Sequence, residues 1–348
     1  MPNQQHILII RLSAMGDVAI AVPVIRELIR EYPTTRVTVV SKPFLKPLFD
    51  DLSNVSFFAA EVTKKHKGLL GLYRLYQDLK KEKITHIADF HNVLRSKILR
   101  SFFMLHRKPT AVINKGRSEK KALIRQKNKI FKQLKTSHQR YADVLNSLGF
   151  SIDLSSQNYT EKKSLSKNVI ALVGLKKNNW IGIAPFAAFA GKVYPINLME
   201  KVIIKIASRG KKVFLFGGGK NEAEILKTIE KKHENILSIA GKVSFKEELE
   251  LIGFLDLMIS MDSGNAHLAA MKQIKTITIW GNTHPYAGFA PFFQPNDYCL
   301  LPDLEKYPKV PSSVYGNKEL KGYENIMESI CPETIINKAM SVLNSQHF

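Results

Sequence analysis

The chain has 348 residues, of which 45% are hydrophobic and 24% charged, so it can bury a full core and is long enough for two domains. Its 52 Lys and Arg residues exceed its 30 Asp and Glu residues, and the formal charge of +22 predicts an anionic partner such as nucleic acid, phosphorylated lipid or a nucleotide. The two cysteines lie outside any CxxC motif, which excludes a disulfide scaffold and a cysteine-rich zinc module and favours a reducing compartment.

The apolar runs are too short for a secretory leader or a membrane span. The first charge is Arg11, and the apolar run before it covers only residues 7–10. No stretch reaches the roughly 18 apolar residues that cross a bilayer. We therefore expect a cytoplasmic protein that is soluble or peripheral to a membrane.

The N-terminal pattern predicts a strand, a loop and a helix. Residues 6–12 are mostly apolar and end in the loop at residues 13–17, as expected of a buried strand in a parallel sheet. Apolar residues then recur at helical spacing from Val18 to Ile29, and Pro33 closes the segment. Pro23 leaves the start of this helix open, because the helix either kinks there or begins one turn before it.

The alternation of strands and helices predicts an α/β protein. Further strands are expected at residues 36–40, 85–90 and 111–114, then, after a Ser- and Lys-rich linker at 151–168, at 180–185, 211–217 and 257–260. Residues 332–343 form a predicted closing helix. Two Rossmann-like halves are the simplest interpretation.

The basic charge is concentrated in the first half of the chain. Between residues 61 and 148 there are 22 Lys and Arg and 6 Asp and Glu, which is +16 of the total +22. The segment is either a set of solvated helix faces or a surface that binds an anionic partner. Near an anionic leaflet each Lys or Arg contributes about 1 kcal/mol, so a few of them suffice to hold a protein at a membrane.

The loop at residues 13–17 is the first candidate for chemistry. Gly16 allows the backbone to approach a ligand, and the amides of the following helix can bind phosphate. Asp17 is predicted at the carboxyl edge of the first strand, where open α/β sheets bind ligands. Its carboxylate is either a general base or a helix cap. A GxGxxG motif is missing from this loop, which argues against an NAD-dependent dehydrogenase.

Two further loops follow predicted strands of the second half. The small-residue loop at 185–195 carries one cation, Lys192, next to a glycine, an arrangement that suits a pyrophosphate, although a lone Lys is usually solvated. The loop at 216–222 has three consecutive glycines, which indicate a close approach of the backbone to a ligand or to a neighbouring strand. Its Glu222 is a candidate acceptor for a ribose or sugar hydroxyl.

Residues 261–270 give the strongest single signal. Asp262, Ser263 and Gly264 place a carboxylate, a hydroxyl and a permissive turn at the start of a predicted helix, which can hold a sugar hydroxyl and a phosphate together. His267 on the same helix is either a ligand contact or a partly buried structural histidine.

Several of these motifs, in this order, resemble the ADP-heptose:lipopolysaccharide heptosyltransferases of glycosyltransferase family 9. The resemblance rests on Ile-Leu-Ile-Ile-Arg-Leu-Ser-Ala-Met-Gly-Asp-Val at residues 7–18, Lys-Val-Tyr-Pro at 192–195 and Asp-Ser-Gly-Asn-Ala-His-Leu-Ala-Ala at 262–270. Residues 89–97, 138–149 and 281–285 also resemble motifs of that family, so the similarity covers most of the chain.

The resemblance implies a GT-B fold, in which two Rossmann-like domains face a central cleft. It implies an N-terminal acceptor-side domain at residues 1–155, a linker at 156–170 and a C-terminal nucleotide-sugar-binding domain at 171–331. The helix at 332–348 is expected to return towards the N-terminal domain. The family is inverting and independent of metals, and the sequence contains no Asp-x-Asp pair. No cofactor is therefore expected besides the donor substrate.

The resemblance also implies a role for particular residues. Asp17 is the expected catalytic base. The residues expected to bind the donor are Met15, Gly16, Ala187, Ala188, Lys192, Glu222, Asp262, Ser263, Gly264 and His267. Among these, Lys192 is expected at the donor phosphates. In the basic segment, which would face an anionic acceptor, Lys97, Arg117 and Arg140 are the residues expected to bind it.

Two positions depart from the family pattern. Ala187 and Ala188 stand where small hydroxyl residues commonly precede the phosphate-contacting Lys, and His284 stands where an acidic residue usually precedes Pro285. Donor affinity or identity is expected to differ accordingly.

The predicted function is transfer of heptose from ADP-heptose to the lipopolysaccharide inner core. The acceptor is then an anionic lipid-linked saccharide, and the protein a peripheral one on the cytoplasmic face of the bacterial inner membrane. One alternative is a hexosyltransferase of the same fold with another nucleotide-sugar donor. A basic nucleic-acid-binding protein is a second alternative, but no RNP, KH or zinc motif supports it.

Overall fold

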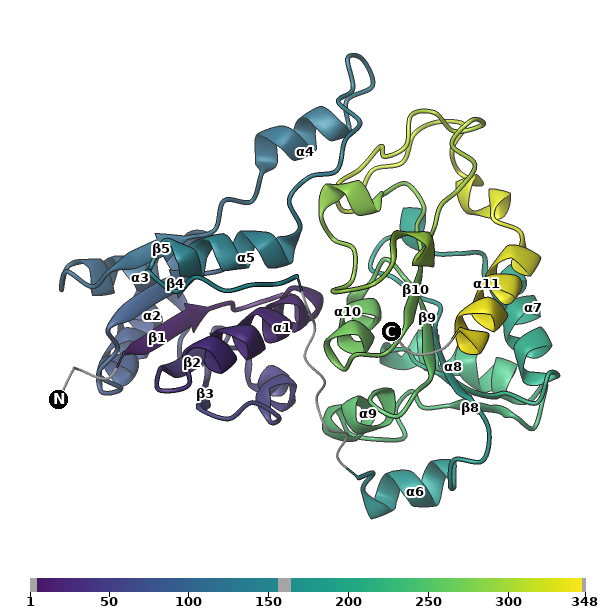
Figure 1. Cartoon of the computed structure of the whole chain (residues 1–348), viewed down its shortest axis with the longest axis horizontal. Helices are drawn as coiled ribbons and strands as arrows, with labels where there is room; N and C mark the ends of the chain where they lie inside the picture. Colours follow the sequence, from purple (N-terminus) through teal and green to yellow (C-terminus); the bar gives the residue numbers. More distant parts are fainter. Residues whose placement is uncertain (1–4, 156–163, 346–348) are drawn as a thin grey trace. The chain divides into compact units, whose positions relative to one another are not determined.

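The computed structural model describes residues 5–155 and 164–345, which divide into two compact units. The first unit comprises residues 1–115 and 137–157, and the second comprises residues 116–136 and 158–348. Figure 1 shows that each unit has its own parallel sheet with helices packed against it.

The described part of the first unit contains a five-stranded parallel sheet of order β3-β2-β1-β4-β5. Its strands are β1 (His6–Ile10), β2 (Arg36–Ser41), β3 (Val55–Ala59), β4 (His86–Asp89) and β5 (Thr110–Val112). Its helices are α1 (Met15–Glu31), α2 (Gly68–Lys80), α3 (Leu94–Met104) and α5 (Ser137–Asn146). All five residues of β1 are buried, which fits its central place in the sheet.

The helices of the first unit cover both faces of its sheet. α1 leads from β1 to β2, whereas α3 leads from β4 to β5 in the opposite direction along the sheet. Because such crossovers are right-handed, α1 and α3 lie on opposite faces. α5 packs beside α1, and α2 packs beside α3. α1 runs through Pro23 without a break, so the helix begins two turns before the proline.

The second unit repeats the pattern with a parallel sheet of order β11-β10-β9-β6-β7-β8 in its described residues. Its strands are β6 (Trp180–Ala184), β7 (Lys212–Leu215), β8 (Ile236–Ser238), β9 (Leu257–Met261), β10 (Thr276–Ile279) and β11 (Cys299–Leu300). Its helices are α4 (Arg117–Leu123), α6 (Lys167–Val173), α7 (Ile196–Ala207), α8 (Gly219–Glu230), α9 (Phe245–Ile252), α10 (Gly264–Met271) and α11 (Pro332–Asn344).

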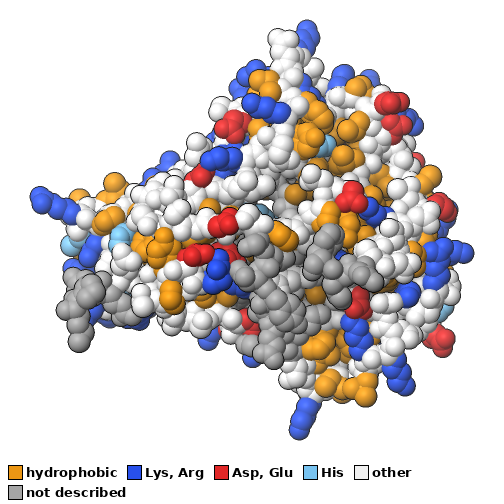
Figure 2. Space-filling view, in the orientation of Figure 1, with side chains coloured by type: hydrophobic (Ala, Val, Ile, Leu, Met, Phe, Trp, Pro, Cys, Tyr) orange, Lys and Arg blue, Asp and Glu red, His pale blue; other side chains and the backbone are white. Residues whose placement is uncertain are grey.

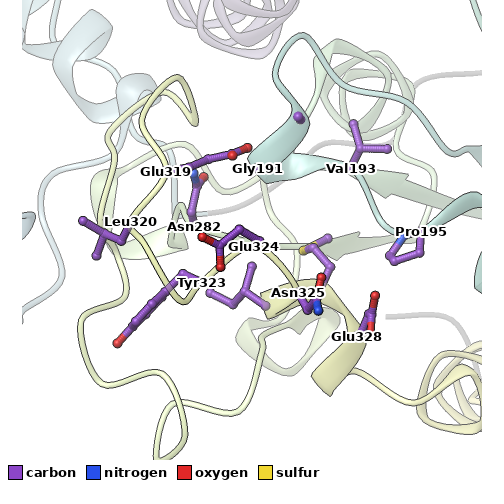
Figure 3. Close-up of a pocket in the computed structure, with 13 residues that line it drawn as sticks. Gly191, Val193, Pro195, Asn282, Glu319, Leu320, Tyr323, Glu324, Asn325 and Glu328 are labelled. Carbon is purple, nitrogen blue, oxygen red and sulfur yellow. The ribbon is translucent and has the colours of Figure 1, made fainter.

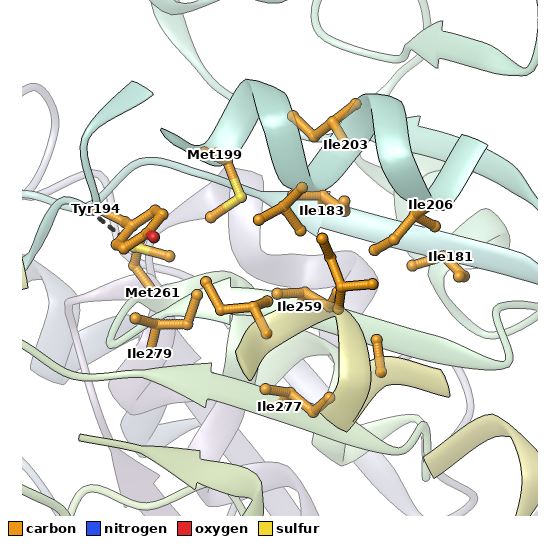
Figure 4. Close-up of a cluster of buried hydrophobic side chains, with 14 of the residues drawn as sticks. Ile181, Ile183, Tyr194, Met199, Ile203, Ile206, Ile259, Met261, Ile277 and Ile279 are labelled. Carbon is orange, nitrogen blue, oxygen red and sulfur yellow. Dashed lines mark hydrogen bonds between the residues drawn. The ribbon is translucent and has the colours of Figure 1, made fainter. Parts of the chain in front are cut away.

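The core of the second unit lies between its central strands and two helices. Buried residues of β6, β9 and β10 form one cluster with residues of α7, and Figure 4 shows Ile183, Ile259 and Ile277 in it together with Ile203 of α7. The closing helix α11 belongs to the same core, with Ile335 and Ala339 fully buried. The described contacts of α11 are with α7 and β9 of the second unit. The expected return of this helix towards the N-terminal domain stays a prediction.

The two compact units differ in one place from the predicted domain boundary. Residues 116–136 fall inside the predicted N-terminal domain, yet they belong to the second unit. There Leu123 and Leu134 form a small apolar cluster with Ala287, and the Leu134 amide donates to the Tyr286 carbonyl at 3.0 Å. Of the predicted linker at 156–170, residues 156–163 lie outside the described residues, and its last residues already belong to α6.

Candidate active site

In the first unit, Asp17 lies at the switch point of the sheet, where the connections from two neighbouring strands leave in opposite directions. β1 and β4 are neighbours whose connections leave in opposite directions, so the space beyond their carboxyl ends is not covered by a crossover. Open α/β sheets bind ligands at such a switch point. Asp17 follows β1, and His91 follows β4, so both residues flank this point as the sequence predicted for Asp17.

Asp17 is held by a buried arginine at the end of the same strand. Its Oδ2 forms an ion pair with the Arg11 guanidinium, and 34% of the Asp17 side chain is exposed. Arg11 also donates to the Phe90 carbonyl at 2.8 Å. Burial alone would lower the pKa of Arg11, but the interactions of its guanidinium with Tyr141 and with the Asp17 carboxylate keep that pKa above its ordinary value. Arg11 is therefore a fixed cation that orients a half-exposed carboxylate.

The alternative role of Asp17, a helix cap, is visible in the same geometry. The Ala14 amide donates to Asp17 Oδ2 at a long 3.4 Å, so the side chain occupies the third position of α1 as in a capping box. The same oxygen pairs with Arg11, and the partial exposure of the side chain leaves it accessible. Capping of α1 therefore does not prevent the Asp17 carboxylate from contacting a ligand.

Aromatic packing fixes the backbone around Asp17. Phe90 and Tyr141 stack with ring centroids 4.3 Å apart, and the Tyr141 hydroxyl donates to the Asp17 carbonyl at 3.3 Å. Burial raises the pKa of Tyr141, which keeps the hydroxyl protonated as a donor. This contact ties α5 to the start of α1.

His91 lies at the same switch point, after β4. The sequence analysis included it in the family-like motif at residues 89–97 but gave it no role. Its ring is buried, and Nδ1 has no hydrogen-bond partner among the residues that the structure describes. Burial, followed by the nearby Arg11 and Lys115, lowers the pKa of His91 to about 4. The turn that carries it is rigid, because buried Asp89 accepts from the His91 amide and pairs with Arg100. The ring is therefore neutral at physiological pH.

The second unit brings two predicted donor residues together at its own switch point. β6 and β9 are neighbours, and their following loops carry Lys192 and Asp262. Lys192 Nζ lies 3.1 Å from Asp262 Oδ2, and both side chains are about nine-tenths buried. Thr283, which the sequence analysis did not single out, donates to the same oxygen at 2.9 Å.

The loop that carries Lys192 is fastened on both sides. The Tyr194 amide donates to Met261 Sδ at 3.3 Å, which Figure 4 draws as a dashed line, and the Tyr194 hydroxyl donates to the Ile330 carbonyl at 2.6 Å. The stem of Lys192 runs over Gly316, where an added Cβ would lie 2.4 Å from its Cδ and Cγ. Lys192 is therefore positioned by packing and not only by its charge.

The start of α10 supplies further polar groups next to Asp262. Ser263 is the N-cap, and its hydroxyl lies 3.1 Å from the Ser260 hydroxyl instead of capping the helix. Gly264 is the first residue of α10, so the uncapped amides there suit an anion. His267 is buried in the helix, which fits the structural alternative for this residue.

Glu222, Ala187 and Ala188 lie on two other loops at the carboxyl edge of the same sheet. Glu222 Oε2 accepts from the Gly218 amide at 2.7 Å and thereby caps its own helix, α8. Ala187 packs against the core and Ala188 is exposed, and both follow β6. Met15 and Gly16, which we also expected at the donor, begin α1 in the first unit.

The three predicted acceptor residues lie in different surroundings. Lys97 is exposed on α3. Arg140 is buried on α5 and donates to the Asn114 carbonyl at 3.1 Å, so it is not a freely solvated cation. Arg117 begins α4 and therefore belongs to the second unit, contrary to the expected N-terminal placement. Figure 2 shows Lys and Arg side chains spread over the visible face of both units.

His284, which departs from the family pattern, is a structural residue in its loop. Its Nδ1 accepts from the Tyr286 amide at 3.1 Å, and its ring packs edge-on against Phe131 of the segment 116–136. Burial, followed by nearby Lys129, lowers the pKa of His284 to about 4. The neutral ring that accepts this bond is therefore the stable form.

A cavity of about 250 Å³ lies in the second unit near the Lys192 loop. Figure 3 shows that Gly191, Val193, Pro195 and Asn282 line it together with residues between 319 and 328, among them Glu319, Glu324 and Glu328. None of the predicted site residues is among its lining residues. In the described ranges no cluster of three or more His, Cys, Asp or Glu could hold a metal ion, and no helix there has the length and apolar character to cross a bilayer.

Comparison with known proteins identifies the family. The sequence model of glycosyltransferase family 9 (heptosyltransferase) matches residues 72–319. The chain is 27% identical to lipooligosaccharide heptosyltransferase 2 of Haemophilus influenzae, covering 97% of this chain and 99% of that protein. It is 29% identical to lipooligosaccharide heptosyltransferase 2 of Campylobacter jejuni, but this match spans about half of each protein, 48% and 52%.

Solved structures show the same fold. A glycosyltransferase of family 9 from Veillonella parvula matches with a TM-score of 0.75 at 16% identity, over 99% of this chain and 98% of that one. The Escherichia coli heptosyltransferase WaaC with ADP-2-deoxy-2-fluoro heptose matches with a TM-score of 0.67 at 15% identity, over 97% and 99%. The predicted GT-B fold with two Rossmann-like domains is thus confirmed, and the chain belongs to glycosyltransferase family 9, the heptosyltransferases.

Proposed function

We propose that this protein transfers heptose from ADP-heptose to the inner core of lipopolysaccharide. The observation that carries the proposal is the arrangement of Lys192, Asp262 and Thr283 at the switch point of the second sheet. A buried ammonium beside an uncapped helix start suits a diphosphate. Membership in the heptosyltransferase family supports ADP-heptose as the donor.

In this proposal the reaction inverts the anomeric centre and needs no metal or cofactor. Asp17 takes the proton of an acceptor hydroxyl as that oxygen attacks the anomeric carbon, and the nucleoside diphosphate leaves. Arg11 keeps the Asp17 carboxylate oriented for that proton transfer. Lys192 and the amides of Ser263 and Gly264 stabilise the negative charge that develops on the leaving diphosphate.

The remaining donor contacts follow from the same arrangement. Asp262 Oδ2 is engaged by Lys192 and Thr283, so we assign a sugar hydroxyl to Oδ1. Glu222 is proposed to contact the nucleoside, and the loop with Ala187 and Ala188 to offer backbone amides to the phosphates. Met15, Gly16 and His267 complete the proposed donor set.

The acceptor in this proposal is an anionic lipid-linked saccharide, bound by Lys97, Arg117 and Arg140. The protein acts from the cytoplasmic face of the inner membrane as a peripheral enzyme. The net charge of +22 supports an anionic acceptor and an anionic leaflet, because both would attract the chain at long range. No nucleic acid is involved.

A hexosyltransferase with another nucleotide-sugar donor is the second candidate. The observation that favours it is the absence of side-chain hydroxyls at Ala187 and Ala188, where family members commonly carry them. A different donor would need different contacts at this loop.

The test is a thermal-shift screen of the purified protein with ADP-, UDP-, GDP- and CDP-sugars. A ligand that binds only the folded state at 100 times its Kd adds about 2.7 kcal/mol to the free energy of unfolding. We expect stabilisation by ADP-heptose and by ADP. Stabilisation by another nucleotide sugar alone would select the hexosyltransferase, and a flat response to all four nucleotides would contradict both.

A further inference from the structure

Exposed apolar side chains gather on two neighbouring helices of the first unit. α2 exposes Leu69, Leu70 and Tyr73, with 63%, 76% and 47% of these residues accessible. α3 exposes Leu94 in its first turn and Leu105 at its C-cap, with 73% and 79% of these residues accessible. Soluble proteins expose single apolar side chains everywhere, but a contiguous group marks an interaction site. The question is whether these side chains form one surface.

The spacing along each helix aligns them. Tyr73 follows Leu69 by four residues and Leu70 by three, so both leucines lie on the same face of α2 as Tyr73. On α3, Leu94, Ile98, Phe102 and Leu105 repeat at intervals of four, four and three residues, which gives a second stripe. Ile98 and Phe102 are half-buried members of that stripe.

Ring contacts place the two stripes next to each other. Tyr73 of α2 meets Phe102 of α3 edge-on with ring centroids 5.5 Å apart. About one turn further along both helices, the Tyr76 hydroxyl lies 3.1 Å from His106 Nδ1. The helices thus run side by side in the same direction, and the stripes form one face, which we name the α2–α3 face.

The charge around the α2–α3 face is strongly positive. Between residues 64 and 108 the chain has 12 Lys and Arg and 3 Asp and Glu. One of these acids, Asp89, is fully buried and paired with Arg100. Lys67, Arg74, Arg95 and Lys97 are all exposed on or beside the two helices. An apolar stripe bordered by cations is complementary to lipid acyl chains beneath anionic headgroups.

The position of the face relative to Asp17 is also informative. α2 and α3 follow β3 and β4, so both helices begin at the carboxyl edge of the first sheet. Asp17 lies at that same edge. Leu69, Leu70 and Leu94 lie in the first turns of α2 and α3, which are the ends of these helices towards that edge.

We propose that the α2–α3 face is the surface by which this protein docks on an anionic lipid membrane. The Leu and aromatic side chains insert between headgroups, the flanking Lys and Arg residues contact lipid phosphates, and the carboxyl edge with Asp17 is brought close to the bilayer. The proposal deepens the membrane contact stated above and rests on it for the choice of a lipid partner.

The test is co-sedimentation of the full chain with vesicles of phosphatidylcholine and 30% phosphatidylglycerol, compared with phosphatidylcholine alone. We expect binding to the anionic vesicles that weakens in high salt. Leu70→Gln should weaken binding about threefold or more, and Leu70→Gln with Leu105→Gln at least about tenfold. Leu175→Gln, at a residue 74% exposed in the second unit, is the matched control and should bind as the wild type does.

Three outcomes would overturn the proposal. One is wild-type protein that ignores anionic vesicles, and a second is an equal loss of binding in Leu175→Gln. The third is unchanged vesicle binding in the Leu70→Gln and Leu105→Gln double variant, with self-association that this variant abolishes, because the face would then belong to a second copy of the chain. The thermal shift with ADP should be the same in all variants, so a failure of the proposed donor is recognised separately from a failure of docking.

Discussion

Each unit has a carboxylate at the same point of its fold, but the two carboxylates differ in their exposure to solvent. In each, a carboxylate at the switch point of a parallel sheet is paired with a cation, Asp17 with Arg11 in the first unit and Asp262 with Lys192 in the second. The Asp17 side chain is 34% exposed, whereas that of Asp262 is 9% exposed and also accepts from Thr283. An accessible carboxylate can receive a proton, whereas a buried and doubly engaged one positions its partners. In the proposed mechanism, this difference in burial separates the base from the binding group.

The largest effect is expected at Asp17. Asp17→Asn keeps the size and the capping contact but removes the base, so turnover with ADP-heptose and a lipopolysaccharide acceptor should fall by about 10² to 10⁴. Stabilisation by ADP should persist, because Asp17 lies in the first unit and the proposed diphosphate contacts in the second. Turnover within a factor of three of wild type would remove Asp17 from the role of base.

The next prediction concerns the second unit, where Lys192 pairs with Asp262. Lys192→Met removes charge-assisted bonds to the diphosphate, so the Kd for ADP should rise roughly 10- to 100-fold. It also leaves Asp262 buried without its cation, and the free energy of unfolding should drop by about 3 kcal/mol.

The double variant Lys192→Met with Asp262→Asn separates these two effects. It should regain most of the stability, because no buried charge is left unpaired, but not the affinity for ADP. Denaturant titration and calorimetric ADP binding give the two readouts. Recovery of ADP binding in the double variant would show that Lys192 is structural only.

Acid should act on both units through buried histidines. The pKa values of His91 in the first unit and His284 in the second are lowered to about 4 by burial, below the 6.5 of an unfolded histidine. The unfolded state therefore binds more protons between these values, so stability is full above pH 6.5 and is lost as pH falls towards 4. After allowance for solvent screening, the protonation of each histidine should lower the free energy of unfolding by about 2 kcal/mol as pH falls towards 4.

Urea midpoints at pH 7, 5.5 and 4 measure this loss. His91→Gln and His284→Gln should each flatten part of the pH dependence, and His284→Gln should in addition cost stability at pH 7, because the Tyr286 amide loses its acceptor. If the urea midpoint changes with pH equally in the wild type and in both variants, other groups cause the acid sensitivity.

Gly316 tests whether Lys192 is positioned by packing. Gly316 has φ +84° and an added Cβ would lie 2.4 Å from the Lys192 stem, whereas Gly322 has φ +81° and nothing within 4 Å. Both Gly→Ala variants carry the same backbone strain, about 1 to 2 kcal/mol. Only Gly316→Ala should also weaken ADP binding, by several-fold. An equal effect of both variants on ADP affinity would show that the stem contact does not matter.

The sequence predicted the central strands and the carboxylates well, because these depend on local pattern. Buried runs such as residues 6–10 and 257–261, each followed by a loop and a helix, place Asp17 and Asp262 at the correct edge of their sheets. The edge strands β3, β8 and β11 were not predicted, since they are short or half-exposed and lack a continuous apolar run. The inner strand β10 was also missed, because its four buried residues alternate between Thr and Ile instead of forming an apolar run.

Features that depend on tertiary contacts could not be predicted from spacing. The attachment of residues 116–136 to the second unit depends on Leu123 and Leu134 meeting Ala287, more than 150 residues away. The hydrogen bond from Thr283 to Asp262 and the burial of His91 Nδ1, without a hydrogen-bond partner in the described residues, likewise arise from packing between distant segments. Arg140 looks like a surface cation in the sequence, yet α5 buries it.

The smallest effect, and the one that addresses donor choice, is expected at Ala188. This exposed residue follows β6 on the loop that precedes Lys192, so a hydroxyl added there could donate to a diphosphate bound at the loop. One such bond contributes about 1 kcal/mol, and Ala188→Thr should lower the Kd for ADP about threefold to tenfold. Ala188→Val has the same shape without the hydroxyl and should leave the Kd unchanged. If both variants bind ADP as the wild type does, the loop at 187–188 does not contact the phosphates, and the low hydroxyl content of this loop gives no support to a different donor.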